Sequence, residues 1–298
     1  MRVRNRVVVV FGAMAMLGCG VALAADNIKV EDLLQHHLDS VGSSQLRAAA
    51  KNRVVEGTAA YRVLVGGSGE ILGKCVMASE ADKLQILMKI NALKYHGEKF
   101  IKNGDKTFVA GTYDDGSRSE FGTFLRSEDL PLKGGVLGGV WSTGWPLLDE
   151  KNKDKMHYDG LKKVEGTSLH AVSYRAKKNS DMDIILYFDP ETFHHVLTVY
   201  KVSVHAGLAP PDSSDQALPN DLSGGKDALS ARQQQTRYRI EERFSDFRKY
   251  DDLTLPSHYN LRFSGEYQNG FTKTVEWDVT ASRMLTNIQL DARNFDVP

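Results

Sequence analysis

A succession of alternating segments is the feature that most limits what this chain can fold into. Along residues 83–90, apolar side chains occupy every second position and mostly polar side chains lie between them. Successive side chains of a strand point to opposite faces, so this pattern predicts a strand with one buried face. We predict further strands at 55–65, 71–79, 97–102, 106–110, 156–164, 168–177, 182–188, 193–205, 233–246, 256–265, 272–281 and 285–291.

Short turn signals connect several of these segments. Asn103-Gly104 is a hairpin signal, and the proline of Asp189-Pro190 presets the backbone of a turn. Neighbouring strands joined by short turns form an antiparallel meander, and the sheet must curl because strand twist accumulates. We therefore predict a mainly β fold with some α (α+β) around a curled antiparallel sheet.

A helical pattern precedes the strands. Along residues 30–41, apolar side chains and one histidine recur at helical spacing, at Val30, Leu33, Leu34, His37, Leu38 and Val41. Gly42 is a suitable C-terminal stop, and a short Ala-rich helix follows it. We interpret His37 as a packing residue because it shares the apolar stripe and has no ligand motif beside it.

The first 24 residues predict a secretory signal peptide. Three arginines precede an apolar run that ends in Ala22-Leu23-Ala24, a pattern that favours export with cleavage after Ala24. An alternative lies at Met16-Leu17-Gly18-Cys19, which is similar to a lipoprotein box. In that alternative, a lipid on Cys19 anchors the mature chain.

Two segments interrupt the strands. Residues 130–148 are apolar and glycine-rich, and their one charged side chain is Lys133. We interpret them as a helix or loop across the mouth or inner face of the sheet, because their apolar side chains would be costly to leave in water. Residues 206–231 are rich in Pro, Gly, Ser and Asp and predict a mobile loop within one domain.

Charge and cysteine content exclude two further properties. The chain has 38 basic and 38 acidic side chains, whereas nucleic-acid-binding domains carry a basic excess, so we expect no nucleic-acid partner. With Cys19 inside the predicted signal, Cys75 is the one cysteine left, and an internal disulfide is excluded. We interpret Cys75 as a small buried apolar residue.

No catalytic or cofactor motif stands out. The glycines around Ser68 and Ser142 lack the spacing of a nucleophile elbow, and no zinc-protease, phosphate-loop or dinucleotide fingerprint is present. His194 and His195 are adjacent on a predicted strand, so they point to opposite faces and cannot easily share a metal. We therefore predict no enzyme, no metal and no cofactor, and we name no catalytic residue.

The composition favours a binding role. A curled sheet with an apolar inner face can enclose a ligand pocket, although the same alternation is compatible with a filled core. If a cavity is present, we expect its lining to include Leu34, Leu38, Tyr61, Met88, Trp141 and Trp145.

Three stretches resemble one family. They are VEDLLQHHLDSVGSSQLRAAAKNRVVEGTAAY at 30–61, YFDPETFHHVLTVY at 187–200 and FSDFRKYDDLTLPSHYNLRF at 244–263. Together they resemble the bacterial outer-membrane lipoprotein-sorting (LolA/LolB-like) superfamily, more its periplasmic branch than its dedicated carrier. Leu253 stands where that family has a glycine. Arg53 and Arg62 lie on the first predicted strand, but neither matches the motif of the carrier's acyl-releasing arginine, and we transfer no role to them.

The resemblance implies one periplasmic domain over residues 25–298, an unclosed half barrel covered on its concave side by helices. It implies a carrier or binder of a lipid, an acyl chain or a lipidated protein, with transient membrane contact. The alternative is a filled shell that serves as an envelope protein-interaction or stress-sensor module, and a third hypothesis is an envelope hydrolase. We expect a monomer.

Overall fold

The computed structural model describes residues 28–93, 95–113, 118–148, 150–205, 235–267 and 269–298. The predicted signal peptide at 1–24, the alternative anchor at Cys19 and the predicted loop at 206–231 lie outside the described residues.

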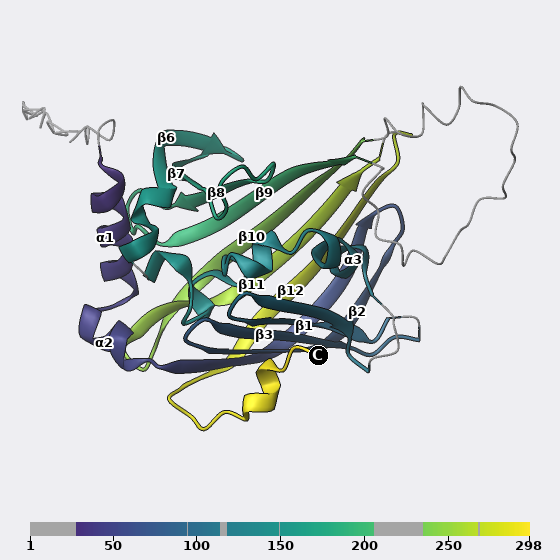
Figure 1. Cartoon of the computed structure of the whole chain (residues 1–298), viewed down its shortest axis with the longest axis horizontal. Coiled ribbons are helices and arrows are strands. Elements are labelled where there is room, and N and C mark those ends of the chain that lie inside the picture. Colours follow the sequence, from purple (N-terminus) through teal and green to yellow (C-terminus); the bar gives the residue numbers. More distant parts are fainter. Residues whose placement is uncertain (1–27, 94, 114–117, 149, 206–234, 268) are drawn as a thin grey trace, which may run out of the picture.

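The strands of the described chain form one open antiparallel sheet (Figure 1). They are β1 (Asn52–Val65), β2 (Gly69–Glu80), β3 (Lys83–Ile90), β4 (Gly97–Asn103), β5 (Lys106–Gly111), β6 (Met156–Val164), β7 (Thr167–Tyr174), β8 (Asp183–Phe188), β9 (His195–His205), β10 (Gln235–Tyr250), β11 (Leu253–Glu266) and β12 (Thr272–Thr286). Their order across the sheet is β5-β4-β3-β2-β1-β12-β11-β10-β9-β8-β7-β6, which leaves β5 and β6 as the two edges. The predicted unclosed antiparallel sheet, a half barrel, is confirmed.

Short helices accompany the sheet. They are α1 (Val30–Val41), α2 (Ser44–Ala49), α3 (Glu120–Ser127) and α4 (Leu130–Lys133), with 3-10 turns η2 (Gly139–Trp141), η3 (Pro146–Leu148), η4 (Glu150–Lys155) and η5 (Ala292–Phe295). Figure 1 shows α1 at one end of the sheet and α3 toward the other. The predicted helix at 30–41 and its stop at Gly42 are confirmed, since the Gly42 N–H bonds the Leu38 carbonyl.

The two faces of the sheet differ in chemistry. On β12, Val275, Trp277 and Val279 are almost fully buried, and they alternate with Glu276 and Asp278 on the opposite face. We call the face that carries Trp277 the inner face and the opposite one the outer face. The main apolar core of the described chain lies against the inner face.

Residues 119–148, which we call the cover segment, pack on the inner face. The ring of Phe121 contacts that of Trp277 with centroids 5.6 Å apart, and Trp141 contacts Tyr259 at 5.2 Å. The cover segment contains α3, α4, η2 and η3. The sequence pattern did not predict α3, which is only eight residues long and begins where the Ser119 hydroxyl accepts the Gly122 N–H at 3.0 Å.

The end of the chain differs from the sequence prediction. Separate strands were predicted at 272–281 and 285–291, but β12 runs unbroken from Thr272 to Thr286. It continues because Met284 still pairs with Val55 of β1. Asn287 then ends the strand with a positive φ of 55°, and the following residues place Phe295 in a small second core with Val54 and Ala78.

Candidate functional site

The residues predicted to line a cavity occupy the core. Leu34, Met88, Trp141 and Trp145 are at most 3% exposed and belong to the main apolar cluster, against which the half-buried Tyr61 packs. Leu38 is also half-buried but lies outside that cluster. The structure therefore brings five of the six residues to the inner face, where the chain's own side chains surround them.

The two tryptophans fix the cover segment at two points. The indole Nε1 of Trp141 donates to the Pro256 carbonyl at 2.7 Å. The ring of Trp145 lies against those of His195 and His37, with centroids 4.9 Å and 5.2 Å away. His37 is buried, and burial lowers its pKa to about 4, which agrees with its interpretation as a neutral packing residue.

A buried arginine of β1 holds the middle of the cover segment. The Nη1 atom of Arg53 donates to the carbonyls of Val140 and Trp141 at 2.6 Å and 3.3 Å. Burial lowers the pKa of this guanidinium to about 10. The partners are backbone oxygens, so the contact depends on where the segment lies and not on its side chains.

A buried carboxylate of β10 contacts the same region of the cover segment, and its charge is opposite in sign to that of Arg53. Glu242 accepts hydrogen bonds from the Gly138 N–H and the Tyr259 hydroxyl, both at 2.7 Å, and from the Tyr200 hydroxyl. Burial raises its pKa to about 7, although the three donors act in the other direction. Gly138 has a φ of 84°, a left-handed conformation that favours glycine, and a Cβ there would also press on the flexible end of Met77, 2.4 Å away.

A second carboxylate holds the start of α3. Glu98 of β4 accepts from the Ser119 N–H and hydroxyl, at 2.8 Å and 2.7 Å, and from the Tyr95 hydroxyl at 2.8 Å. Burial raises the pKa of Glu98. Gly122 lets the helix approach this closely, because a Cβ there would lie 1.8 Å from a Glu98 oxygen. Ser79 adds a further contact by accepting the Thr143 N–H at 3.0 Å.

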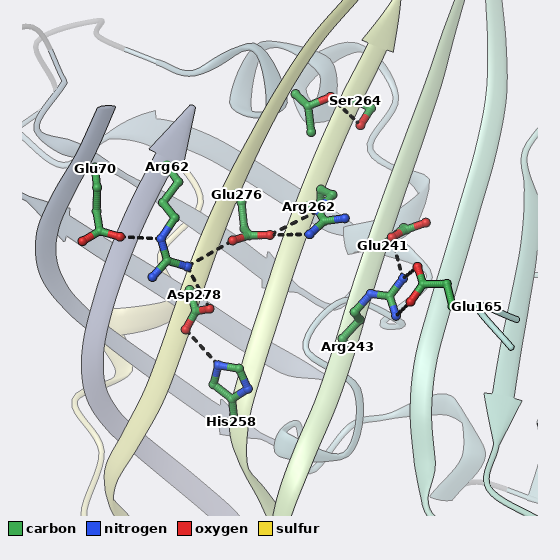
Figure 2. A network of polar contacts seen from close by, with 11 residues as sticks. Arg62, Glu70, Glu165, Glu241, Arg243, His258, Arg262, Ser264, Glu276 and Asp278 are labelled. Carbon is green, nitrogen blue, oxygen red and sulfur yellow. Dashed lines mark hydrogen bonds and ion pairs between the residues drawn. The ribbon is translucent and has the colours of Figure 1, made fainter. Parts of the chain in front are cut away.

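The outer face carries a network of opposite charges (Figure 2). Arg62 bridges Glu70, Glu276 and Asp278, and Arg262 binds Glu276 at 2.8 Å. Further along the sheet, Arg243 binds Glu165 and Glu241 at 2.7 Å and 3.1 Å. Burial acts to raise the pKa of Glu276, but the hydrogen bonds, with that from Arg262 foremost, hold it below its usual value. The positive and negative side chains of the network therefore largely neutralise one another.

A groove of about 640 Å³ lies over part of this network. Its lining comes from β7, β9, β10, β11 and β12 and from the turns between β6 and β7 and between β8 and β9, and it includes Glu165, Ser245, His258, Asn260 and Asp278. None of the six predicted cavity residues lines it. Its lining mixes polar side chains with apolar ones such as Leu169, Val196 and Leu197, so the groove can take a ligand that carries both polar and apolar groups.

The described ranges differ from a metal centre and from a membrane-spanning helix in the residues they bring together. They hold no group of three or more His, Cys, Asp or Glu side chains that could bind a metal ion. No helix among the described residues combines the length and the apolar character needed to cross a membrane. Cys75 is buried, and burial raises the pKa of its thiol to about 12, which agrees with a packing role.

The sequence pattern missed the polar residues that hold the cover segment. A signal was present, because these residues occupy inward positions of alternating strands. Glu242 stands between Ile240 and Phe244 on the inner side of β10, and Arg53 shares the parity of Val55 on β1. A charged side chain at an inward position is costly to bury unless it is paired, so such positions could have been singled out.

No family model matches the chain, and no curated protein matches it either. Among solved structures, a LolA superfamily protein from Nitrosomonas europaea is similar at 10% identity and a TM-score of 0.40, covering 91% of this chain and 99% of that one. A domain described as an outer membrane lipoprotein-sorting protein, from Vibrio parahaemolyticus, is similar at 9% identity and a TM-score of 0.38, covering 88% and 97%. The MucA/MucB complex of Pseudomonas aeruginosa matches at 10% identity and a TM-score of 0.23, covering 87% and 100%. The first carries the name of the superfamily that three stretches of this chain resemble, and the second is described by the lipoprotein sorting after which that superfamily is named.

Proposed function

We propose that the protein is a periplasmic binder of an acyl chain, carried by a lipid or a lipidated protein, and that the cover segment occupies the binding face when no ligand is present. In this proposal the inner face is the concave side of the half barrel, and the helices close it. The observation that carries the proposal is that buried charged groups of the sheet hold the cover segment through its backbone.

The free-energy cost of burying these charged groups favours a cover segment that can leave the inner face. Arg53, Glu98 and Glu242 are buried, and apolar residues of similar volume at such positions are often as stabilising or more so. A permanently filled core would be about as stable with apolar residues in their place. A cover that leaves and returns would gain a defined docking position, because each charged group regains hydrogen bonds to the segment only when the segment is in place.

An acyl chain is the ligand that could replace the cover. Without the cover, large apolar side chains of the inner face, including Trp277, Phe244 and Tyr259, would lose their packing partners. Burial of a methylene group contributes about 0.8 kcal/mol, so a chain of about fourteen methylenes would regain roughly 11 kcal/mol. A small polar ligand has no comparable source of free energy.

Displacement of a fluorescent fatty acid tests the proposal. We expect unlabelled fatty acids of about 14 to 18 carbons to displace the fluorescent one at roughly micromolar concentration. We also expect native mass spectrometry to detect a lipid that co-purifies with the protein. Failure of both measurements would remove the acyl-binding function.

A second candidate is an envelope protein-interaction or stress-sensor module with a permanently filled shell. It is favoured by the complete burial of Leu132, Val136 and Leu137 of the cover segment, whereas an open groove lies on the outer face. This candidate predicts no acyl binding and no movement of the cover. A protein partner would then bind the outer surface.

A further inference from the structure

Three side chains from adjacent strands form a chain of hydrogen bonds on the outer face. The Oγ atom of Ser245 on β10 lies 3.0 Å from Nδ1 of His258 on β11. The other ring nitrogen of His258, Nε2, lies 2.8 Å from Oδ1 of Asp278 on β12, a contact visible in Figure 2. The alignment follows from the register, because Ser245 faces His258 directly and Asp278 faces Asn260, two residues further along β11.

The carboxylate at the end of this chain is held in place and ionised. The second oxygen of Asp278 accepts from Nη1 of Arg62 at 3.0 Å. Burial acts to raise the pKa of Asp278, but the bonds from His258 and Arg62 hold it below its usual value. An ionised Asp278 keeps a proton on Nε2, which leaves the lone pair of Nδ1 directed at the Ser245 hydroxyl.

The serine at the other end is open to a ligand. Ser245 is exposed, and it lines the 640 Å³ groove together with His258 and Asp278. The next residue, Asp246, has a φ of 55° and its carbonyl accepts the Ser257 hydroxyl at 2.7 Å, so the backbone leaves the regular strand path beside Ser245. Strained backbone of this kind is concentrated at functional sites.

We propose that Ser245, His258 and Asp278 form a nucleophilic relay that cleaves carboxylic esters bound in the outer-face groove. A serine activated by an imidazole, which a carboxylate orients, is the arrangement that acyl transfer requires, and it is recognised by geometry and not by sequence order. The roles of the two ring nitrogens are exchanged here relative to the usual relay, but both nitrogens of a neutral imidazole serve equally as base or as donor. The site is independent of the acyl-binding face.

The reaction balances with water as the one co-substrate. Ser245 Oγ bonds to the ester carbonyl carbon while its proton passes to Nδ1 of His258, and the imidazolium returns that proton to the departing alkoxide as the ester C–O bond breaks. Water then bonds to the acyl carbon while its proton passes to Nδ1 of His258, and the imidazolium returns that proton to Ser245 Oγ as the bond from Oγ to the acyl carbon breaks and the acid leaves. Arg243 lies two residues before Ser245 on the same face and lines the groove, but Glu165 and Glu241 occupy its guanidinium, so we assign it no role in the reaction.

Labelling with a fluorophosphonate probe tests the relay on the full chain. We expect one adduct on Ser245 by peptide mass spectrometry, no adduct in Ser245→Ala, and at least tenfold slower labelling in His258→Gln. Ser264→Ala is the matched control, because Ser264 lies on the outer face of β11 and its partner is Thr274, at 3.1 Å, with no histidine. That variant should label like the wild type.

Hydrolysis of 4-nitrophenyl butyrate gives the second readout. Ser245→Ala should lose at least tenfold in kcat/KM while its melting temperature and its fatty-acid binding stay unchanged, since the residue is exposed and remote from the inner face. The relay is overturned if the wild type forms no adduct on Ser245, or if His258→Gln labels at the wild-type rate. Either result would assign the three residues to cross-strand hydrogen bonding alone.

Discussion

Glu242 and Gly138 are 104 residues apart in sequence, yet a carboxylate oxygen of the first accepts the backbone N–H of the second at 2.7 Å. This contact joins the middle of β10 to the cover segment. Glu242 also accepts two tyrosine hydroxyls, so one buried carboxylate joins the cover segment to three strands of the sheet, β9, β10 and β11.

Removal of that carboxylate should destabilise the fold. Glu242→Ala leaves the Gly138 N–H and two buried hydroxyls without an acceptor, and we expect a loss of about 3 kcal/mol in the free energy of unfolding, measured in urea. Glu266→Ala is the control, because the Glu266 side chain is 62% exposed and its ion pair with Arg237 is long, at 4.0 Å. Its effect should stay below about 0.5 kcal/mol, and equal effects of the two variants would contradict the assigned role.

Glu242 should also give the stability a specific pH dependence. Its folded pKa of about 7 lies above the value near 4.5 of the unfolded chain, so between these pH values the folded state binds more protons. The stabilisation that comes from this difference in pKa is fully present below pH 4.5 and is lost as the pH rises through 7. The loss amounts to roughly 3 kcal/mol in the free energy of unfolding. Burial of His37 lowers its pKa to about 4 and produces the opposite trend between pH 4 and 6.5.

The two trends can be separated with one variant. Glu242→Gln removes the titration of residue 242 but leaves the histidines unchanged. The stability of the wild type minus that of Glu242→Gln should therefore fall steadily from pH 4.5 to 7. A difference that is constant with pH would show that Glu242 titrates normally in the folded protein.

Arg53 should control the opening of the cover segment. Arg53→Leu removes the donor to the Val140 and Trp141 carbonyls, and we expect hydrogen exchange at residues 138–143 to accelerate at least tenfold. Arg62→Leu is the matched control, because Arg62 lies on the same strand but on the outer face. The cover should exchange at the wild-type rate in that variant.

Cys75 should report the same opening chemically. Its buried thiol has a pKa of about 12, so in a Cys19→Ser chain at pH 8 we expect no reaction with a disulfide reagent in the native state and full reaction in urea. Arg53→Leu should react faster than the wild type. A fast reaction in the native wild type would contradict the burial of Cys75.

The sequence predicted what depends on local pattern and missed what depends on pairing across the sheet. Alternation of Leu84, Ile86 and Met88 identified β3, and helical spacing identified α1, because each pattern lies within one element. Ser245, His258 and Asp278 carry no joint signal, since the register of three strands brings them together. The extent of β12 was missed for the same reason, because it is set by pairing with β1.

In our proposal the cover segment leaves the inner face before an acyl chain binds, so a reversible lock on the segment should block binding. Ser79 Oγ and Thr143 Oγ1 are 3.3 Å apart, so Ser79→Cys with Thr143→Cys, in a Cys19→Ser, Cys75→Ala chain, places two sulfurs within reach of a disulfide. We expect the oxidised protein to bind a fluorescent fatty acid at least tenfold more weakly than the reduced protein, with each single-cysteine variant unaffected by oxidation. Equal affinity in the two states would show that the cover segment does not have to move for an acyl chain to bind, and no binding in either state would contradict acyl binding itself.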